Sequence, residues 1–222
     1  MITKDGWLSE QLDKPVFNVS EDADLSWDFT THGLYCYRTD SEKSLTVAIQ
    51  KGFDLISVTV RLERSLAKEE EVNNRVCSSY VVSRDRILDM AENCFVYDRF
   101  HKDPMIDKKK ASNLKKNWVA NCLDWRRGDF VFQRYDGFLC SLIKESGKGK
   151  IAIIDLIGVD SKMRSRGIGV GMINSFFYYY AYFRGINTFA VSTQLDNLPS
   201  LALYRKCGFK IVGHQYILHL HT

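Results

Sequence analysis

Proline is rare in this 222-residue chain, which has only three, and the sequence also lacks repeats and low-complexity segments. Disordered chains are rich in proline and poor in aromatic residues, whereas aromatic residues make up 13% of this chain. The composition therefore excludes an extended disordered protein and indicates a folded one. The length allows one large domain or two small ones.

The sequence also lacks paired-cysteine motifs and long apolar runs. No two of its six cysteines form a Cys-x-x-Cys pair, which is typical of reduced cytosolic thiols and not of a disulfide framework or a zinc site. The longest uncharged run, residues 167–183, has 17 residues and includes four tyrosines, whereas a membrane-spanning helix needs about 20 mostly apolar residues. The N-terminus has no apolar segment typical of a signal peptide. We therefore expect a cytoplasmic protein with no membrane partner and no metal.

Charge is unevenly distributed along the chain. Residues 1–60 carry five basic and ten acidic residues, whereas residues 61–222 carry 26 and 17. The basic part predicts an anionic partner such as a phosphorylated small molecule, or else a solvated face without a ligand. The strongest basic patch, residues 108–116, lacks the interleaved aromatic residues of a nucleic-acid surface, and we expect no nucleic-acid partner.

Hydrophobic periodicity predicts an α/β mixture. Residues 1–30 are acidic and irregular, and residues 100–107 are predicted to form a loop. The expected helices are 44–51, 85–94, 108–123, 168–183 and 197–206. The expected strands are 34–38, 53–63, 76–82, 129–134, 138–144, 150–159, 188–192, 209–213 and 216–221. We divide the chain into an N-terminal α/β region, residues 1–75, and a second domain, residues 76–222.

A basic loop and a glycine-rich helix start follow the apolar strand that contains Asp155. The first N–H groups of a helix have no internal partners and, with the helix dipole, they favour an anion. Arg164 and Arg166 add positive charge beside Gly167 and Gly169. This arrangement suits a pyrophosphate, although it differs from the Rossmann and Walker patterns. A purely structural helix start is the alternative.

A second segment runs from Asn197 to Phe209, after the next strand. Asn197 and Tyr204 are seven positions apart, so two helical turns place them on one face. A structural interpretation is also open: Asn197 can be an N-cap with Pro199 in the first turn, and Gly208 can end the helix.

Together the two segments resemble the GCN5-related N-acetyltransferase (GNAT) superfamily over about residues 115–215. The Arg/Gln-x-x-Gly-x-Gly/Ala motif of that superfamily matches residues 164–169, and an Asn followed by Leu-Tyr-x-x-x-Gly-Phe matches residues 197–209. The resemblance implies a GNAT fold: a mostly antiparallel mixed sheet with splayed strands, flanked by helices.

The resemblance also implies acetyl-CoA as co-substrate and a role for each motif residue. Backbone groups of Ile157 and Val159 would bind the pantetheine arm and the acetyl carbonyl, and Asn197 would contact the same arm. Tyr204 would protonate the departing thiolate, which is plausible for a phenol of pKa near 10 and a thiol of pKa about 8.5. The pyrophosphate would be held by Arg164, Ser165, Arg166, Gly167, Ile168, Gly169 and Val170. Many members have glycine in place of Ser165.

Residues 52–63 and 98–104, with Trp118, are similar to the dTDP-fucosamine acetyltransferase group. This similarity implies acetylation of an amine on a nucleotide-linked amino-deoxy sugar by direct attack, in surface polysaccharide biosynthesis. Acetylation of a protein N-terminus or another small-molecule amine is the alternative within the superfamily, and a non-catalytic CoA-binding module is the alternative outside enzymes. The aromatic-rich C-terminal half is compatible with a homodimer.

The general base stays unassigned at this stage. A protonated amine must lose a proton before it attacks, and the candidates are His101, Asp103, Asp155 and Asp160. The C-terminal histidines, His214, His219 and His221, are expected to end strands or lie at the surface.

Overall fold

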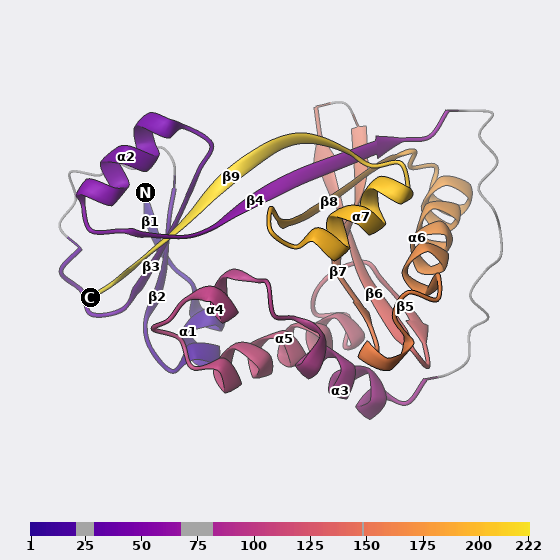
Figure 1. Cartoon of the computed structure of the whole chain (residues 1–222), viewed down its shortest axis with the longest axis horizontal. Helices are drawn as coiled ribbons and strands as arrows, with labels where there is room; N and C mark the ends of the chain where they lie inside the picture. Colours follow the sequence, from indigo (N-terminus) through magenta and orange to yellow (C-terminus); the bar gives the residue numbers. More distant parts are fainter. Residues whose placement is uncertain (21–28, 68–81, 148) are drawn as a thin grey trace.

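A single mixed sheet forms the centre of the molecule in a computed structural model that describes residues 1–20, 29–67, 82–147 and 149–222 (Figure 1). Its strand order is β1-β2-β3-β9-β4-β8-β7-β6-β5. Neighbouring strands are antiparallel except for β2 with β3 and β7 with β8. The strands are β1 (Ile2–Lys4), β2 (Val16–Val19), β3 (Leu34–Thr39), β4 (Asp54–Ser65), β5 (Phe130–Arg134), β6 (Gly137–Ser146), β7 (Gly149–Val159), β8 (Thr188–Gln194) and β9 (Lys210–His221).

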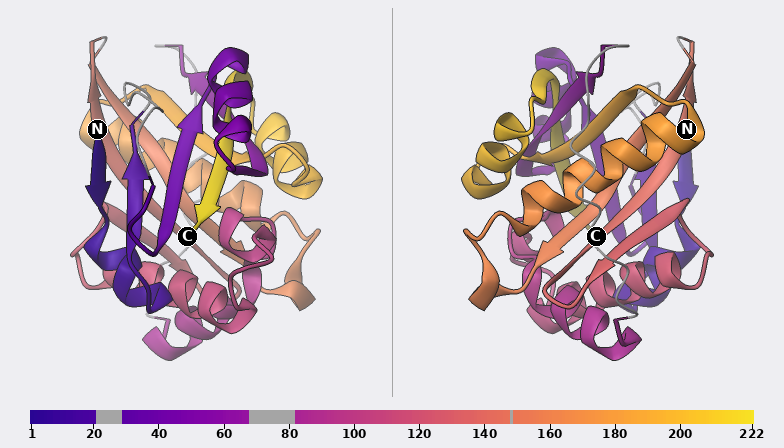
Figure 2. Two further views of the ribbon diagram at one scale, coloured as in Figure 1. Left: turned by 90° about the vertical axis from the view of Figure 1, so that its left-hand side faces the viewer. Right: turned by 90° about the vertical axis from the view of Figure 1, so that its right-hand side faces the viewer.

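Helices cover both faces of the sheet (Figures 1 and 2). One face carries α2 (Glu42–Gln50), α6 (Ile168–Tyr178, continued by a π-helix at Tyr179–Phe183) and α7 (Leu198–Lys206). The other carries α1 (Gly6–Leu12), α3 (Arg84–Cys94), α4 (Arg99–Lys102) and α5 (Lys108–Leu123). We call this second side the α4 face. The mixed, mostly antiparallel sheet with helices on both faces confirms the predicted GNAT fold.

The core is packed on both faces by apolar side chains from distant parts of the sequence. On the α6 side, Phe176 and Tyr180 are completely buried and pack with Phe189 of β8. On the α4 face, Leu114 and Val119 of α5 are equally buried. Among the described residues, no helix is long and apolar enough to cross a membrane.

Two long strands, β4 and β9, connect the N-terminal and C-terminal parts of the sheet (Figure 1). β9 pairs with β4 over residues 210–219 and with β3 over residues 216–221. The boundary that we predict after residue 75 lies outside the described residues, so the division into two regions stays a prediction.

Three sequence-based expectations are wrong. Residues 1–20 are not irregular, because Asp5 caps α1 through a 2.9 Å hydrogen bond from the Leu8 N–H and β2 pairs with β3. The loop predicted at 100–107 overlaps the short helix α4, which Asp98 caps. The two closing strands are one continuous strand, since Gly213 keeps its pairing with Arg61 of β4. The strand predicted at 76–82 falls outside the described residues, except for Val82.

Candidate active site

Strands β7 and β8 separate at a bulge in β7. Cys140 of β6 opposes Leu156, whereas the next residue, Ser141, opposes Ile154, so Asp155 is the additional residue. A bulge bends its strand and increases the local twist. β7 and β8 pair only over residues 152–154 and 189–191, and beyond this point the two strands diverge. The expected splay is therefore present, and Ile157 and Val159 lie in the part of β7 that is not paired with β8.

The extra residue of the bulge is held on the α4 face. The Asp155 carboxylate accepts hydrogen bonds of 2.8 Å from the Trp118 indole and 2.9 Å from Nε of Arg127. The Arg127 guanidinium also lies over the Trp118 ring, 4.2 Å from its centre. Asp155 thus has two donors and is fixed at the point where the strands part.

The loop between β7 and α6 brings the predicted pyrophosphate residues together at the end of β7. Ser165 has φ of +63° and Gly167 has φ of +78°. The left-handed conformation costs a residue with a side chain roughly 1–2 kcal/mol, so glycine would fit this position at a lower cost than Ser165. Arg164 donates from Nε to the Val159 carbonyl at 3.3 Å, and Arg166 is exposed.

The start of α6 offers free backbone donors. The first intrahelical bond is from the Gly171 N–H to the Gly167 carbonyl, so the N–H groups of Ile168, Gly169 and Val170 have no partner inside the helix. No side chain caps this helix within the described chain. Such a helix start favours an anion.

The second glycine of the motif has a packing role. A Cβ on Gly169 would lie 3.0 Å from Cδ2 of Leu203, which belongs to α7. Glycine therefore allows α6 and α7 to approach closely.

Asn197 and Tyr204 lie at the two ends of α7. The Asn197 side chain accepts from the Ser200 N–H at 3.3 Å and donates to the Thr193 hydroxyl at 3.1 Å, so it caps the helix. Tyr204 is 3% exposed and packs edge-on against Phe209. Burial raises the pKa of Tyr204, so the phenol stays protonated at neutral pH. None of the described residues is hydrogen-bonded to its hydroxyl.

The remaining candidates for a general base are already paired. His101 has Nδ1 2.5 Å from Asp98 and Nε2 3.2 Å from the Ser112 hydroxyl. Asp160 accepts from the Arg86 guanidinium and from the Lys162 N–H. Because of these interactions, neither His101 nor Asp160 is free to act as a general base.

Asp103 forms a buried network with two C-terminal histidines. Its carboxylate lies 2.5 Å from Nδ1 of His219 and 2.8 Å from Nε2 of His221. His219 is completely buried within β9, so the expectation that it ends a strand or lies at the surface is wrong. Hydrogen bonds from the two histidines lower the pKa of Asp103. His219 and His221 are two positions apart, and residues with this spacing on a strand face the same side. The spacing could therefore have predicted that the two histidines lie together.

The same three side chains are the one group that could hold a metal within the described residues, with ligand atoms within 4.8 Å of one another. The ammonium of Lys14 lies 2.9 Å from Nδ1 of His221. A positive charge at this distance opposes a second cation, so the cluster fits a hydrogen-bonded network better than a metal centre.

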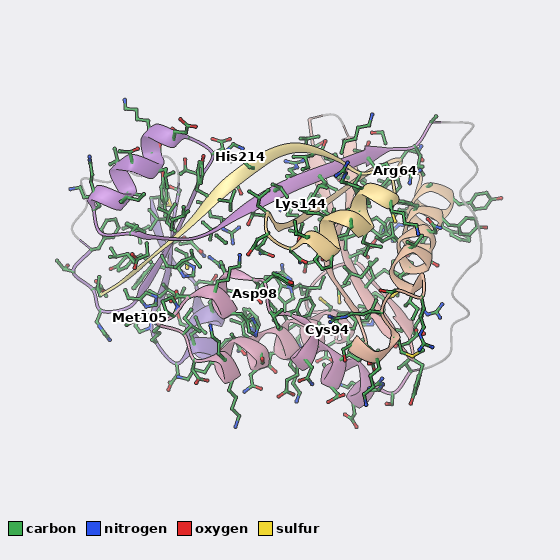
Figure 3. All side chains as sticks on the ribbon, viewed as in Figure 1. Arg64, Cys94, Asp98, Met105, Lys144 and His214 are labelled. Carbon is green, nitrogen blue, oxygen red and sulfur yellow. The ribbon has the colours of Figure 1, made fainter. Side chains whose placement is uncertain are left out.

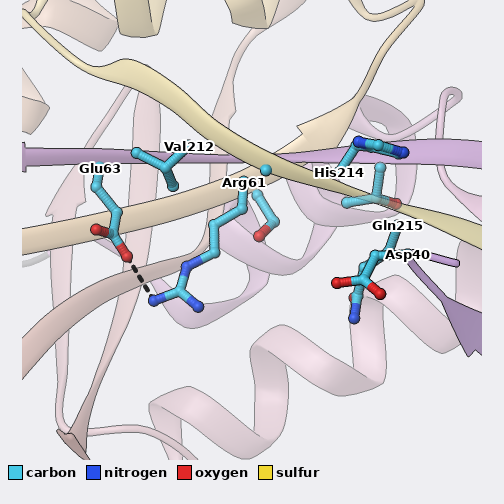
Figure 4. A pocket seen from close by; sticks show the side chains of 9 residues that line it. Asp40, Arg61, Glu63, Val212, His214 and Gln215 are labelled. Atoms are coloured by element: carbon cyan, nitrogen blue, oxygen red, sulfur yellow. Dashed lines mark ion pairs between the residues drawn. The ribbon is translucent and has the colours of Figure 1, made fainter. Parts of the chain in front are cut away.

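A pocket of about 450 Å³ lies on the sheet surface (Figure 4). One of its lining residues, Ser192 of β8, directly follows the stretch of β8 that pairs with β7, so the pocket lies beside the strand opening. It is formed by β4, β8 and the first half of β9, with Asp40 from the segment after β3. Arg61 and Glu63 form an ion pair of 2.5 Å at one side. The residues that line it are mainly polar: Asp40, Thr59, Arg61, Glu63, Ser192, Val212, Gly213, His214 and Gln215.

Sequence reasoning missed a second buried network beneath the long strands. Lys115 is 6% exposed, and its ammonium lies 4.0 Å from Asp98 and 4.9 Å from the centre of the Trp118 ring. Figure 3 shows Asp98 on the α4 face of the sheet. Burial lowers the pKa of Lys115, and Lys115 together with His101 holds the pKa of Asp98 at about 2. The resemblance of residues 98–104 to a known group could have pointed to this network. Its partner Lys115 lies on α5, however, and the sequence does not show that the two segments meet.

Residues 85–209 match the family model described as the acetyltransferase (GNAT) family. The chain belongs to this family. The match covers more than half of the chain, and it includes the β7–α6 loop, Asn197 and Tyr204, which confirms the family resemblance seen in the two motifs.

Individual relatives of this GNAT chain are distant. It is 21% identical over 136 residues to the spore coat polysaccharide biosynthesis protein SpsD of Bacillus subtilis (strain 168), covering 61% of this chain and 47% of that protein. The chain thus spans about half the length of that curated relative.

Two solved structures share the fold. A functionally unknown conserved protein from Staphylococcus epidermidis has a TM-score of 0.58 and 13% identity, with 96% of this chain and 88% of that one covered. A GCN5-related N-acetyltransferase from Sphaerobacter thermophilus has a TM-score of 0.54 and 14% identity, with 86% and 60% covered.

Proposed function

We propose that this protein transfers the acetyl group of acetyl-CoA to the amine of a nucleotide-linked, dTDP-type amino-deoxy sugar. One observation carries the proposal: β7 leaves β8 at the Asp155 bulge, and the free helix start of α6 and Tyr204 of α7 belong to the same face of the sheet. Membership of the GNAT family supports acetyl transfer from acetyl-CoA. The nucleotide-linked sugar as acceptor is the more specific part of the proposal.

The proposed binding of acetyl-CoA uses backbone groups. The N–H groups from Ser165 to Val170 would hold the pyrophosphate, with Arg164 and Arg166 adding charge. The pantetheine arm would lie in the opening, along Ile157 and Val159 and near Asn197. The pantetheine arm can pair with the backbone of β7 at Ile157 and Val159, because β8 does not pair with that part of β7.

The proposed reaction is a direct attack of the neutral amine on the acetyl carbonyl. The C–N bond forms first and gives a tetrahedral oxyanion, which a backbone N–H of β7 would stabilise by about 3–4 kcal/mol. The carbon–sulfur bond then breaks as the carbonyl re-forms and the thiolate leaves. Tyr204 gives its proton to the departing thiolate. Its buried phenol stays protonated at neutral pH, which suits this role. The amine gives its proton to water at the opening, because Asp155 and the other candidate bases are already hydrogen-bonded.

Two observations support a sugar as acceptor. The pocket beside the opening is lined mainly by polar side chains, as the hydroxyl groups of a sugar require. The printed name of the Bacillus subtilis relative assigns that protein to spore coat polysaccharide biosynthesis. We also propose a cytoplasmic location, because the five cysteines of the described residues are unpaired, which suits a reducing compartment.

The test is a panel of acceptors assayed for acetyl transfer from acetyl-CoA. It includes dTDP- and UDP-linked amino sugars, the corresponding free amino sugars, and peptides with free N-termini. We expect turnover with a nucleotide-linked amino sugar and little with the free sugar. Activity on a peptide N-terminus without turnover of any sugar would contradict the assignment, and binding of CoA without transfer to any amine would favour a non-catalytic module.

A further inference from the structure

The α4 face carries a row of polar side chains beyond the pocket. On β9, Gln215 lines the pocket, and Ile217 and His219 follow on the same face. His219 lies against Phe100 of α4, so this is the α4 face. Ile217 is paired with Arg38 of β3 on one side and with Ser57 of β4 on the other. Side chains paired across strands share a face, so Arg38 projects on the α4 face, one step along the sheet from the pocket.

Arg99 of α4 is a second guanidinium on this face. It is 9% exposed and lies over the ring of Phe100, 4.5 Å from its centre, and Phe100 in turn lies 6.3 Å from the ring of His219. Nη1 of Arg99 is buried and has no hydrogen-bond partner among the described residues, and neither does the buried hydroxyl of Ser57. Buried polar atoms normally find a partner, so these two groups are available to hydrogen-bond a ligand.

Arg38 and Arg99 belong to the same part of the α4 face, because Cys36, two residues before Arg38 on β3, packs in one cluster with Phe100, the neighbour of Arg99. Proximity to Arg99 is the main cause that lowers the pKa of Arg38, to about 10. The carboxylates nearest to α4 are used elsewhere, since Asp98 pairs with His101 and Lys115 and Asp103 pairs with His219 and His221. Within the described chain, no carboxylate is ion-paired with Arg38 or Arg99. Like charges that are held together without a counter-ion are expected where an anion binds.

We propose that Arg38 and Arg99 form an anion subsite that holds a phosphate group of the acceptor while its amine reaches the β7–β8 opening through the adjacent pocket. The inference rests on the proposed function for the identity of the acceptor. Guanidinium groups bind phosphate oxygens in a bidentate manner, so two of them suit a diphosphate. The subsite would let the protein distinguish an activated sugar from a free one, because only the activated sugar carries the anion.

The test is calorimetric titration of inorganic pyrophosphate into the protein saturated with CoA. Bound CoA fills the loop at 164–170 with its own pyrophosphate, so the titration reports on the second site. We expect Arg38→Gln and Arg99→Gln each to weaken pyrophosphate binding at least tenfold and to leave the CoA affinity unchanged. Arg126→Gln, at an exposed position after α5, is the matched control and should bind pyrophosphate like the parent protein.

Stability is checked separately because Arg99 is buried. Thermal unfolding of each variant shows whether it folds, and Arg38→Gln at an exposed strand position reports on the subsite even if Arg99→Gln does not fold. Titration with inorganic phosphate distinguishes the two sources of the anion: preference for pyrophosphate supports a nucleotide diphosphate, and preference for phosphate supports a sugar monophosphate. Absence of pyrophosphate and phosphate binding, or unchanged affinities in Arg38→Gln, would overturn the subsite.

The acceptor panel separates this inference from the proposed function. Arginine-dependent pyrophosphate binding in a protein that acetylates no nucleotide-linked sugar keeps the subsite and contradicts the sugar assignment. Turnover of a nucleotide-linked amino sugar with the same KM in the parent and in Arg38→Gln keeps the function and overturns the subsite.

Discussion

Gly169 of α6 and Leu203 of α7 are in contact so close that a methyl group on the glycine would lie 3.0 Å from Cδ2 of the leucine. This relationship couples the helix that would bind the pyrophosphate to the helix that carries Tyr204. It also makes a simple substitution informative.

We predict that Gly169→Ala lowers the free energy of unfolding by about 1 kcal/mol, as overpacking typically does. The double variant with Leu203→Ala should recover part of that loss, because the smaller side chain leaves room for the added methyl. Denaturant unfolding of both variants measures the effect. Gly6→Ala, where nothing lies within 4 Å of the added Cβ, is the control and should be neutral or stabilising. Additive losses in the double variant would argue against direct contact.

A second prediction concerns the left-handed backbone at Ser165, which has φ of +63°. Ser165→Val should lower the free energy of unfolding by about 1 kcal/mol beyond the cost that serine already bears, since a β-branched residue tolerates this conformation less well. Ser165→Gly should be at least as stable as the parent protein and should bind CoA with the same affinity, because the backbone N–H is kept. Weaker CoA binding by the glycine variant would show that the serine hydroxyl itself takes part.

Tyr204 and Tyr180 are both buried, but replacing each with phenylalanine should affect different properties of the protein. Tyr204→Phe should lower turnover by roughly 100-fold or more if Tyr204 is the general acid, with little change in stability. Tyr180 is hydrogen-bonded to Ser141 at 2.8 Å and to Asp129 at 2.7 Å. Tyr180→Phe should therefore lower stability by about 1–3 kcal/mol and leave the chemical step unchanged. Steady-state kinetics and denaturant unfolding measure both, and normal turnover in Tyr204→Phe would remove its catalytic role.

The buried carboxylate of Asp98 predicts how stability changes in acid. Its pKa falls from 3.8 to about 2 in the folded protein, where Lys115 and His101 favour the charged form. A lowered pKa contributes stability above the unfolded value, so this contribution, about 2 kcal/mol, is lost as the pH falls from about 4 to 2. The difference in unfolding free energy between the parent protein and Asp98→Asn should therefore shrink over that range.

Lys115→Met tests the origin of that effect. Without the ammonium, the pKa of Asp98 should rise, and acid unfolding of this variant should begin at higher pH than in the parent protein. An unchanged acid transition in both variants would show that Asp98 does not control acid stability. Acid unfolding of the parent protein, Asp98→Asn and Lys115→Met, followed by circular dichroism, makes this comparison.

The sequence alone determined the local features of the protein. The periodic segments predicted α2, α3, α5, α6 and α7 and most of the strands, because periodicity and caps act over a few residues. The two motifs identified the family, since the loop at 164–169 and the Asn197–Tyr204 spacing are each defined within one stretch of chain.

Only the tertiary structure decided which distant side chains meet. Asp103 and His219 are 116 residues apart and form a buried pair because β9 returns between β3 and β4, a topology that no local pattern encodes. The same strand order places Arg38 beside Ile217 and brings Arg99 of α4 near it, on a face that the charge totals could not locate. The basic residues of the chain predicted an anionic partner, and the fold decided that Arg38 and Arg99 form the proposed anion subsite.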